Sequence, residues 1–435
     1  MSLPLKYPSE KDLERNRFWG IPEGATARTI FNLTSGAYLV GLLKAMGASD
    51  AVCGYILAIP VLAAVIQFLS PIVLESLPSK KRIILMGSML HRLLLAILII
   101  IPFLPLDRGI KLWSTGIIFF ISYLAVSFVN PAISNFYVSF VPQNMRGKYF
   151  GSRESYILLS ATVITLIVGK ILDIYTEAGR ELVGYIIVYG VIFVLALINI
   201  LSYMKMKEVP LTHSHERLRI GEIFTLPFKN KVFINYFVMS ILWNIAIQIA
   251  SAYFSVYLKS DLGMNYTTIT VLSMVNSVFY VLSARVWGRF ADKTGWANTT
   301  RVTIGILAIC HALWFLIAKG SPLVLLLLTA THIIGGIAWS GINVALFNLQ
   351  FDFTPDEKRT VYIGFNAATS GIIGYFAAMV GSQLVSHFGK DKITLLGTAY
   401  DIKQILFIVS AILLAFCSLY ISLFMRPKKN KAHSS

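Results

Sequence analysis

Long apolar runs constrain this chain more than any other feature. Runs of about twenty residues, one of which contains LLLAILIIIPFL, follow one another and are separated by short clusters of charge. At ~1.5 Å of rise per residue, a helix of this length crosses the ~30 Å hydrocarbon core of a bilayer. Mean hydropathy is +0.70 and only 14% of residues are charged. Together these features exclude a soluble enzyme, a secreted disulfide scaffold and a disordered protein.

The sequence predicts an all-α integral membrane protein with twelve transmembrane helices in two six-helix bundles. In lipid every backbone N–H and C=O needs an internal partner, so long apolar spans are helices or barrel strands. Barrel strands alternate polar and apolar residues, and these runs do not. The predicted helices cover approximately 21–44, 51–74, 83–105, 112–140, 154–175, 182–205, 232–258, 266–288, 300–318, 322–350, 361–385 and 402–425. We expect bundles within 1–205 and 232–435, joined by a cytoplasmic central loop at 206–231.

Lysine and arginine are distributed unevenly between the two sides of these spans. With the N-terminus placed inside, 25 of them fall in inside segments and 8 in outside loops. This positive-inside bias predicts a multi-pass protein of the cell membrane, such as a bacterial inner membrane, with both termini cytoplasmic. The bias also accounts for the formal charge of +17 without a nucleic-acid partner. The first twenty residues lack the apolar stretch of a secretory signal, so the first helix is expected to remain.

Neither a metal site nor a cofactor is expected. Cys53, Cys310 and Cys417 lie singly in apolar runs and form no CxxC pair. The sequence has no phosphate-binding GxxxxGK[ST] loop, no HExxH and no GxSxG. We therefore predict that the chain is not an enzyme, and that any energy for transport comes from gradients.

The two halves of the chain resemble each other. Segments NPAISNFYVSFVPQNMRGKYFG and NVALFNLQFDFTPDEKRTVYIG align at a constant offset of 213 residues. The aligned pairs are Asn130 and Asn343, Asn135 and Asn348, Pro142 and Pro355, Arg146 and Arg359, Tyr149 and Tyr362, and Gly151 and Gly364. Chance alignment of apolar sequence rarely matches Asn, Pro, Arg and Tyr together. The sequence therefore predicts a duplicated six-helix unit, with both copies in the same orientation.

The segment from Gly288 to Gly295 reads GRFADKTG, between the eighth and ninth predicted helices. It resembles the G-x-L-a-D-r-x-G signature of the major facilitator superfamily, whose members are transporters with twelve helices. In the first half the matching loop is degenerate, and Glu75 stands where the Asp would. The resemblance implies an inter-helix charge lock at Arg289, Asp292 and Lys293, with Gly288 and Gly295 as further gating residues of the signature. Arg146 and Arg359 are expected in the same cytoplasmic layer. The alternative for these last two arginines is plain positive-inside topology.

Polar residues inside spans are costly, so they usually face a cavity or a partner. In the superfamily the first, fourth, seventh and tenth helices line a central cavity. The resemblance therefore implies a substrate site near the midplane, to which we assign Arg28, Asn32, Trp243, Asn244, Gln248 and Asn276. Arg28 and Asn32 are spaced i,i+4 and share a helix face. A guanidinium suits a carboxylate or phosphate, and Trp243 could stack on a ring.

Several of these residues have a structural alternative. Arg28 could form a salt bridge with Glu23, and Trp243 could simply pack. The paired asparagines on the fourth and tenth helices could join helices rather than line a cavity. His91 and Arg92 lie on the third helix, which is peripheral in the superfamily, so pairing or snorkelling is expected there. For proton coupling, Glu23 is the one carboxylate well placed in a predicted cavity helix, while Glu154 lies at a membrane edge.

These features favour a secondary transporter, a permease that carries a small organic solute by alternating access. The alternative is a receptor or an embedded enzyme built on a transporter-like body. No convergent acidic and histidine cluster supports an enzyme, and no signalling domain supports a receptor. Within transporters, metabolite uptake, drug efflux and flipping of a lipid-linked substrate all remain open, as do substrate identity and coupling. Expected partners are the solute, the lipid bilayer and protons, and we expect a monomer.

Overall fold

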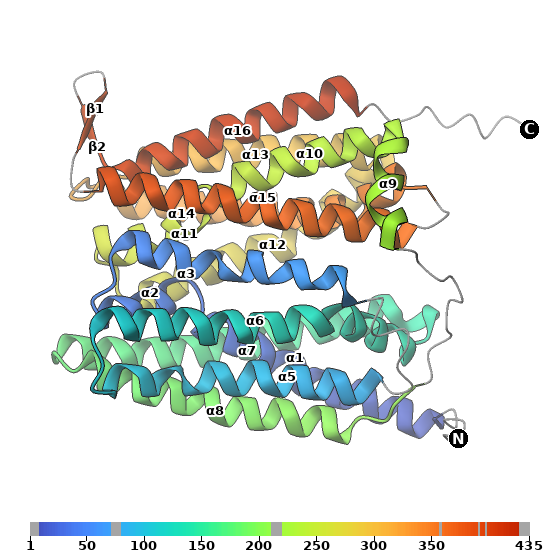
Figure 1. Ribbon diagram of the computed structural model, residues 1–435, viewed down its shortest axis with the longest axis horizontal. Helices are drawn as coiled ribbons and strands as arrows, with labels where there is room; N and C mark the ends of the chain where they lie inside the picture. Colours follow the sequence, from blue (N-terminus) through green and yellow to red (C-terminus); the bar gives the residue numbers. More distant parts are fainter. Residues whose placement is uncertain are drawn as a thin grey trace, which may run out of the picture. The chain divides into compact units, whose positions relative to one another are not determined.

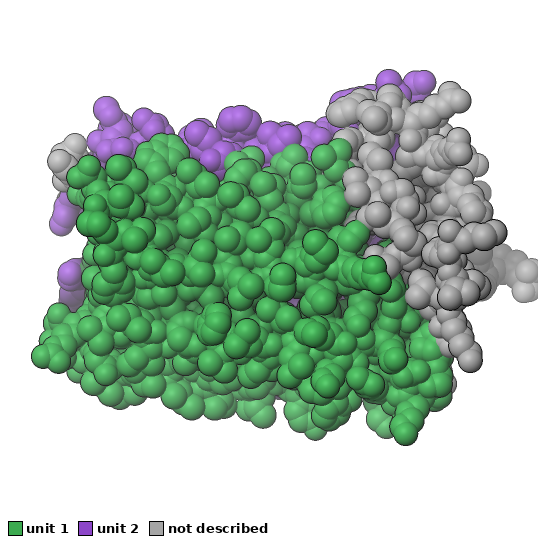
Figure 2. Space-filling view, turned by 60° about the horizontal axis from the view of Figure 1, so that its bottom comes forward, with its two compact units in different colours: residues 1–218, 258–270 green, residues 219–257, 271–435 purple. Residues whose placement is uncertain are grey.

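The computed structural model describes residues 8–70, 80–209, 220–355, 359–389, 392–395 and 398–425. Within these ranges the chain is almost entirely helical, and long helices run side by side in each of two compact units (Figure 1). Unit 1 contains residues 1–218 and 258–270, and unit 2 contains residues 219–257 and 271–435 (Figure 2). The short segment 258–270 thus clusters with the first half of the chain.

The first half of the chain supplies six spans to unit 1. Its elements are α1 (Glu10–Leu33), α2 (Gly36–Ala45), α3 (Asp50–Ala63), the 3-10 helix η1 (Ala64–Phe68), α5 (Lys80–Ala96), the 3-10 helix η2 (Ile97–Phe103), α6 (Arg108–Ser139), the 3-10 helix η3 (Gln143–Met145), α7 (Arg146–Glu177) and α8 (Glu181–Lys205). α1 packs against α7 and α8, and α5 packs against α6 and α8.

The second half of the chain repeats this arrangement. Its elements are α9 (Ile220–Lys229), α10 (Lys231–Gln248), α11 (Ser251–Val256), the π-helix η4 (Tyr257–Asp261), α12 (Tyr266–Thr294), α13 (Trp296–Phe315), α14 (Val324–Phe353), α15 (Arg359–Phe388), β1 (Ile393–Leu395), β2 (Thr398–Tyr400) and α16 (Ile402–Phe424). α10 packs against α15 and α16, and α13 against α14 and α16. Counted by spans, these are the same pairs as in the first half, which is what a duplication predicts.

Ten helices in the described ranges are long and apolar enough to cross a membrane. Together with the α1–α2 pair and α13 they form the twelve-helix fold that the sequence predicts. Three of these spans are not regular α-helices over their whole length. α3 continues into the 3-10 helix η1, α5 into the 3-10 helix η2, and α10 into α11 and the π-helix η4.

The first helix differs from its predicted range of 21–44. It begins at Glu10, where Ser9 and Asp12 form a capping box, and it breaks after Leu33 before α2. The early start has a packing reason, since Leu13 is buried and the Asn16 amide bonds the backbone N–H and C=O of Lys207. At the break Gly36 has a φ of +51°, a conformation that glycine adopts without strain.

Other predicted boundaries also change. The second span reaches Phe68, and the rest of its predicted range from 71 onward lies outside the described residues, as does Glu75. The predicted central loop contains a helix, α9, and the short β1–β2 hairpin precedes α16. The GRFADKTG segment is not a loop, because it forms the end of α12 up to Thr294. Gly295 then turns the chain into α13 with a φ of +82°.

Candidate functional site

An open cavity of about 560 Å³ in unit 1 is lined by α1, α5, α6, α7 and α8. Its charged and polar lining residues are Glu23, Arg28, Arg92, Asn130, Ser134, Tyr137, Arg153, Glu154 and Tyr203. Three of these residues are arginines and two are glutamates, so the lining has an excess of one positive charge when all five are ionised. Such a lining favours a negatively charged occupant.

Glu23 on α1 is the centre of a buried polar network. Its side chain is only 6% exposed, and its Oε2 lies 3.2 Å from Nη2 of Arg153 on α7. The hydroxyl of Tyr137 on α6 donates a short hydrogen bond to the same oxygen. The backbone carbonyl of Glu23 accepts a bond of 2.9 Å from the Asn199 amide on α8. Four helices are therefore joined at this one residue.

The position of Arg153 is fixed by α1 and α6. Its Nε donates to the carbonyl of Gly20 at 2.9 Å, and its guanidinium lies 4.3 Å from the centroid of the Tyr137 ring. Gly24 makes room for this arrangement, because a Cβ at that position would meet Arg153 and Ile157. Arg153 is thus held by an ion pair, a backbone bond and a cation–π contact at once.

Arg92 on α5 is the least satisfied charge of the cavity. The residue is 8% exposed, and its Nε is buried without a hydrogen-bond partner among the described residues. It lies close enough to Glu23 for an electrostatic interaction. Its neighbour His91 faces elsewhere, since Nδ1 lies 2.7 Å from the hydroxyl of Ser122. A buried guanidinium with an unused donor is suited to bind an anion.

Arg28 forms an ion pair that the sequence did not predict. Its Nη2 lies 3.1 Å from Oε1 of Glu154, and the two side chains are 47% and 52% exposed. The alternative of a bridge from Arg28 to Glu23 is wrong, because Glu23 pairs with Arg153. Asn32 lies one turn beyond Arg28, and its amide is 3.5 Å from the Thr165 hydroxyl.

The sequence did not assign Arg153, Tyr137 or Arg92 to a substrate site. Arg153 counted only toward the cytoplasmic charge, Tyr137 carried no signal, and Arg92 was expected to pair or snorkel from a peripheral helix. The Arg92 side chain is buried and lines the cavity, and its electrostatic interaction with Glu23 agrees with the expected pairing. An arginine in the middle of an apolar span was the available signal.

The predicted site residues of the second half lie in unit 2. The rings of Trp243 and Trp339 are in edge contact, with centroids 5.7 Å apart. The Asn244 amide donates to the carbonyl of Ser240 in its own helix at 2.8 Å, and Gln248 accepts from Ser251 at 2.9 Å. Asn276 lines a second, smaller cavity that is wholly within this unit.

The predicted gating residues of the signature are three charged residues and two glycines. Arg289, Asp292 and Lys293 lie in the last turns of α12, and the structure contains no ion pair of theirs with any described residue. Gly288 has open space around it, and Gly295 forms the turn into α13.

Arg146 has a local structural partner. It begins α7, and its guanidinium donates to the carbonyls of Val141 and Val138 at 3.2 and 3.4 Å. A cation placed there satisfies carbonyls at the end of α6. Arg359 begins α15, but its side chain is outside the described part of the chain.

This chain is similar to known proteins in sequence and in fold. The sequence is 24% identical over 259 residues to an uncharacterised MFS-type transporter of Methanocaldococcus jannaschii, an alignment that covers 58% of this chain and 63% of that protein. This chain therefore spans less than two thirds of that relative's length. Solved structures share the fold, among them the following two. The nucleoside transporter NupG has a TM-score of 0.67 and 16% identity, with 96% of this chain and all of NupG covered. The inward-open xylose transporter XylE from E. coli has a TM-score of 0.64 and 13% identity, with 97% and 96% covered.

The sequence profile of the Major Facilitator Superfamily matches residues 24–374, which is most of the chain. The match includes Glu23's neighbour Gly24 at one end and Gly374, packed beside Asn244 and Gln248, at the other. The twelve-helix fold and the predicted signature agree with it. The chain belongs to the Major Facilitator Superfamily, and ten of its described helices are long and apolar enough to cross a membrane.

Proposed function

We propose that this protein is a secondary transporter that carries a small organic anion across the cell membrane by alternating access. The observation that supports this proposal most is the buried guanidinium of Arg92, whose Nε has no hydrogen-bond partner among the described residues. A carboxylate or phosphate would supply an acceptor and a second negative charge beside the guanidinium. Arg28 adds a second cation at the same cavity, and its partner Glu154 is exposed enough to release it.

The size of the cavity is consistent with a metabolite. Small-molecule sites typically occupy ~300–1,000 Å³, and this cavity has about 560 Å³. The assignment of Asn32, Trp243, Asn244, Gln248 and Asn276 to substrate binding stays a prediction from the sequence. Uptake and efflux would use the same groups, so the proposal concerns the solute and not the direction.

Proton coupling is proposed at Glu23. Its carboxylate neutralises the charge of Arg153 in a buried ion pair. Protonation of Glu23 would break this ion pair and leave the Arg153 guanidinium, beside the cavity, without a counter-charge. A proton and an anion would then be favourable together, which is the requirement for symport. The positive-inside bias supports a location in the cell membrane, as in a bacterial inner membrane, with both termini cytoplasmic.

The test is transport by the purified chain in proteoliposomes, with and without a pH gradient. The panel consists of labelled monocarboxylates, dicarboxylates and phosphate esters, with xylose and uridine as neutral solutes. We expect an anion to be transported and Arg92→Gln to abolish its transport. Arg92→Lys keeps the charge but loses the planar fork, so we expect it to raise the half-saturating concentration.

Arg180→Gln is the matched control, because Arg180 is exposed at the start of α8 and does not line the cavity. It should transport as the unmodified protein does. Transport of the neutral solutes alone, or full anion transport by Arg92→Gln, would contradict the proposal.

A further inference from the structure

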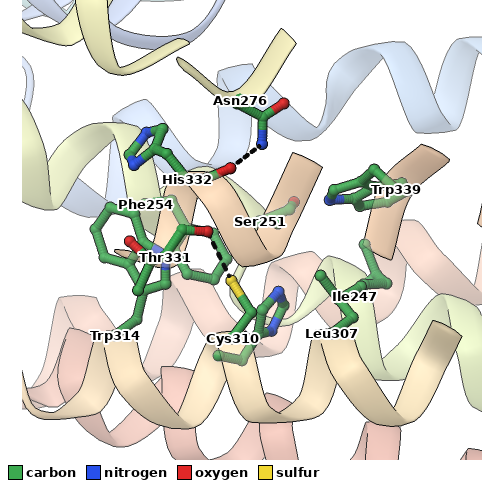
Figure 3. A pocket seen from close by; sticks show the side chains of 12 residues that line it. Ile247, Ser251, Phe254, Asn276, Leu307, Cys310, Trp314, Thr331, His332 and Trp339 are labelled. Atoms are coloured by element: carbon green, nitrogen blue, oxygen red, sulfur yellow. Dashed lines mark hydrogen bonds between the residues drawn. The ribbon is translucent and has the colours of Figure 1, made fainter. Parts of the chain in front are cut away.

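Unit 2 contains its own cavity of about 260 Å³, among α10 to α14 (Figure 3). Aromatic rings form much of its wall, with Phe254 and Trp314 in edge contact at 5.0 Å between centroids. Trp339 and the two imidazoles of His311 and His332 complete the aromatic lining. Among the described residues that line this cavity there is no Asp, Glu, Lys or Arg.

The proton of His311 can be placed from its neighbours. The Ser410 hydroxyl donates to the carbonyl of Ala246 at 2.5 Å, which uses its single proton. The same oxygen lies 2.8 Å from Nδ1 of His311 and must therefore accept, so Nδ1 carries the ring proton. In the neutral ring Nε2 is then left as a hydrogen-bond acceptor.

His332 has the same tautomer for a different reason. Its Nδ1 lies 2.7 Å from the backbone carbonyl of Leu328, and a carbonyl can only accept. Nδ1 is therefore the donor, and Nε2 of the neutral ring is the acceptor. In the part of the chain that the structure describes, neither Nε2 has a hydrogen-bond partner.

Several other polar groups of the lining already form hydrogen bonds within the protein. The Cys310 thiol donates to the carbonyl of Thr331 at 3.2 Å, and the Thr331 hydroxyl donates to Leu328 at 2.8 Å. The Asn276 amide donates to the carbonyl of His332 at 3.1 Å, as drawn in Figure 3. The two imidazole nitrogens thus remain as unused acceptors between aromatic surfaces.

We propose that this cavity binds a neutral, planar aromatic molecule of one or two rings that carries an N–H donor. The rings of Trp314, Trp339 and Phe254 would contact its faces and edges, and Nε2 of His311 or His332 would accept its hydrogen bond. An apolar cavity of ~150 Å³ holds benzene, so about 260 Å³ has room for a two-ring molecule. The lack of a charged residue in the lining selects against ions.

The test compares indole with benzofuran, which have the same shape and differ by one N–H. Binding of each to the purified full-length protein is measured by calorimetry. We expect saturable 1:1 binding of indole, and binding of benzofuran that is roughly 2- to 12-fold weaker, the range for one neutral hydrogen bond. Equal affinities, or no saturable binding of indole, would overturn the proposal.

Variants test whether the preference for indole arises in this cavity. The double variant His311→Phe/His332→Phe should erase the preference for indole, while His387→Phe, an exposed histidine outside the cavity, should keep it. Ser251→Trp fills the cavity from an exposed position and leaves both histidines in place, so it should abolish binding of both molecules. Saturable indole binding by Ser251→Trp would refute the assignment. Because only binding is measured, the result is independent of anion transport.

Discussion

The carboxylate of Asp173, near the end of α7, accepts the backbone N–H of Tyr266 at 2.6 Å. It also accepts the backbone N–H and the hydroxyl of Thr267, at 2.8 and 2.5 Å. Tyr266 is the first residue of α12, so Asp173 does from another helix what an N-cap residue does within its own. This explains why segment 258–270 clusters with unit 1.

Tyr266 strengthens the same attachment through its side chain. Its hydroxyl donates to Glu181 at 2.8 Å and lies 2.9 Å from the hydroxyl of Tyr185. The Lys259 ammonium is 3.7 Å from the centroid of the Tyr266 ring. Gly41 leaves the space that the two tyrosine hydroxyls occupy.

Asp173→Ala should detach the start of α12 from α7. It removes three hydrogen bonds to a charged acceptor, each of which contributes about 1.5–3 kcal/mol. Because part of that is recovered by water, we expect amide exchange over 262–270 to accelerate by roughly 10- to 100-fold. Asp173→Asn keeps one acceptor oxygen, so its exchange rate over 262–270 should lie between those of Asp173→Ala and the unmodified protein. Hydrogen exchange with mass spectrometry measures both.

Glu177→Ala is the control for this prediction, since Glu177 is exposed one turn further along α7. It should leave exchange over 262–270 unchanged. Equal protection in Asp173→Ala and the unmodified protein would show that Tyr266 alone holds the segment.

The sequence was sufficient to predict the twelve membrane spans as helices, because the length of an apolar run is a property of each segment alone. It was not sufficient for their ends. α1 begins at Glu10 because Leu13 and Asn16 pack against distant parts of the chain, which no local pattern records. The GRFADKTG segment was read as a loop from its charges and glycines, although it is the end of a helix.

The sequence predicted some residues of the site but not their ion-pair partners. Glu23 and Arg28 were found because charge inside an apolar span is costly wherever it occurs. Their partners could not be found, because Arg153 and Glu154 lie more than a hundred residues away and are neighbours on one helix turn. Which arginine pairs with which glutamate depends on the rotation of α7 against α1.

Cysteine labelling should reveal the orientation in the membrane. Ala178→Cys places a thiol at an exposed position in the turn before α8, and Lys205→Cys places one at the exposed far end of that helix. Cys53, Cys310 and Cys417 are buried. From the positive-inside bias we expect a membrane-impermeant maleimide to label position 178 in intact cells. Position 205 should react only after the cells are permeabilised. Labelling of position 205 in intact cells would reverse the proposed orientation.

Gly336→Ala should destabilise the protein, although alanine favours helices. A Cβ at Gly336 on α14 would meet the backbone carbonyl of Asn276 on α12, and backbone cannot move aside as a side chain can. We expect a loss of about 1–3 kcal/mol and a lower melting temperature, measured by scanning fluorimetry. Gly190→Ala on α8 is the matched control, because a Cβ there would meet nothing within 4 Å. It should be neutral or stabilising by up to about 1 kcal/mol.

Glu23 and Arg153 should be energetically coupled, whereas Glu23 and Arg28 should not. Removing one member of a buried pair leaves an unpaired charge, at a typical cost of about 3–5 kcal/mol, so Glu23→Gln and Arg153→Gln should each be destabilising. In the double variant neither charge remains, and the loss should be well below the sum of the two. Arg28→Gln removes a half-exposed pair worth at most about 1 kcal/mol, and its effect should simply add to that of Glu23→Gln. The two double-mutant cycles, measured by chemical denaturation in the same detergent, share the variant Glu23→Gln and differ only in the arginine. A larger coupling for Arg28 than for Arg153 would contradict the pairing seen in the structure.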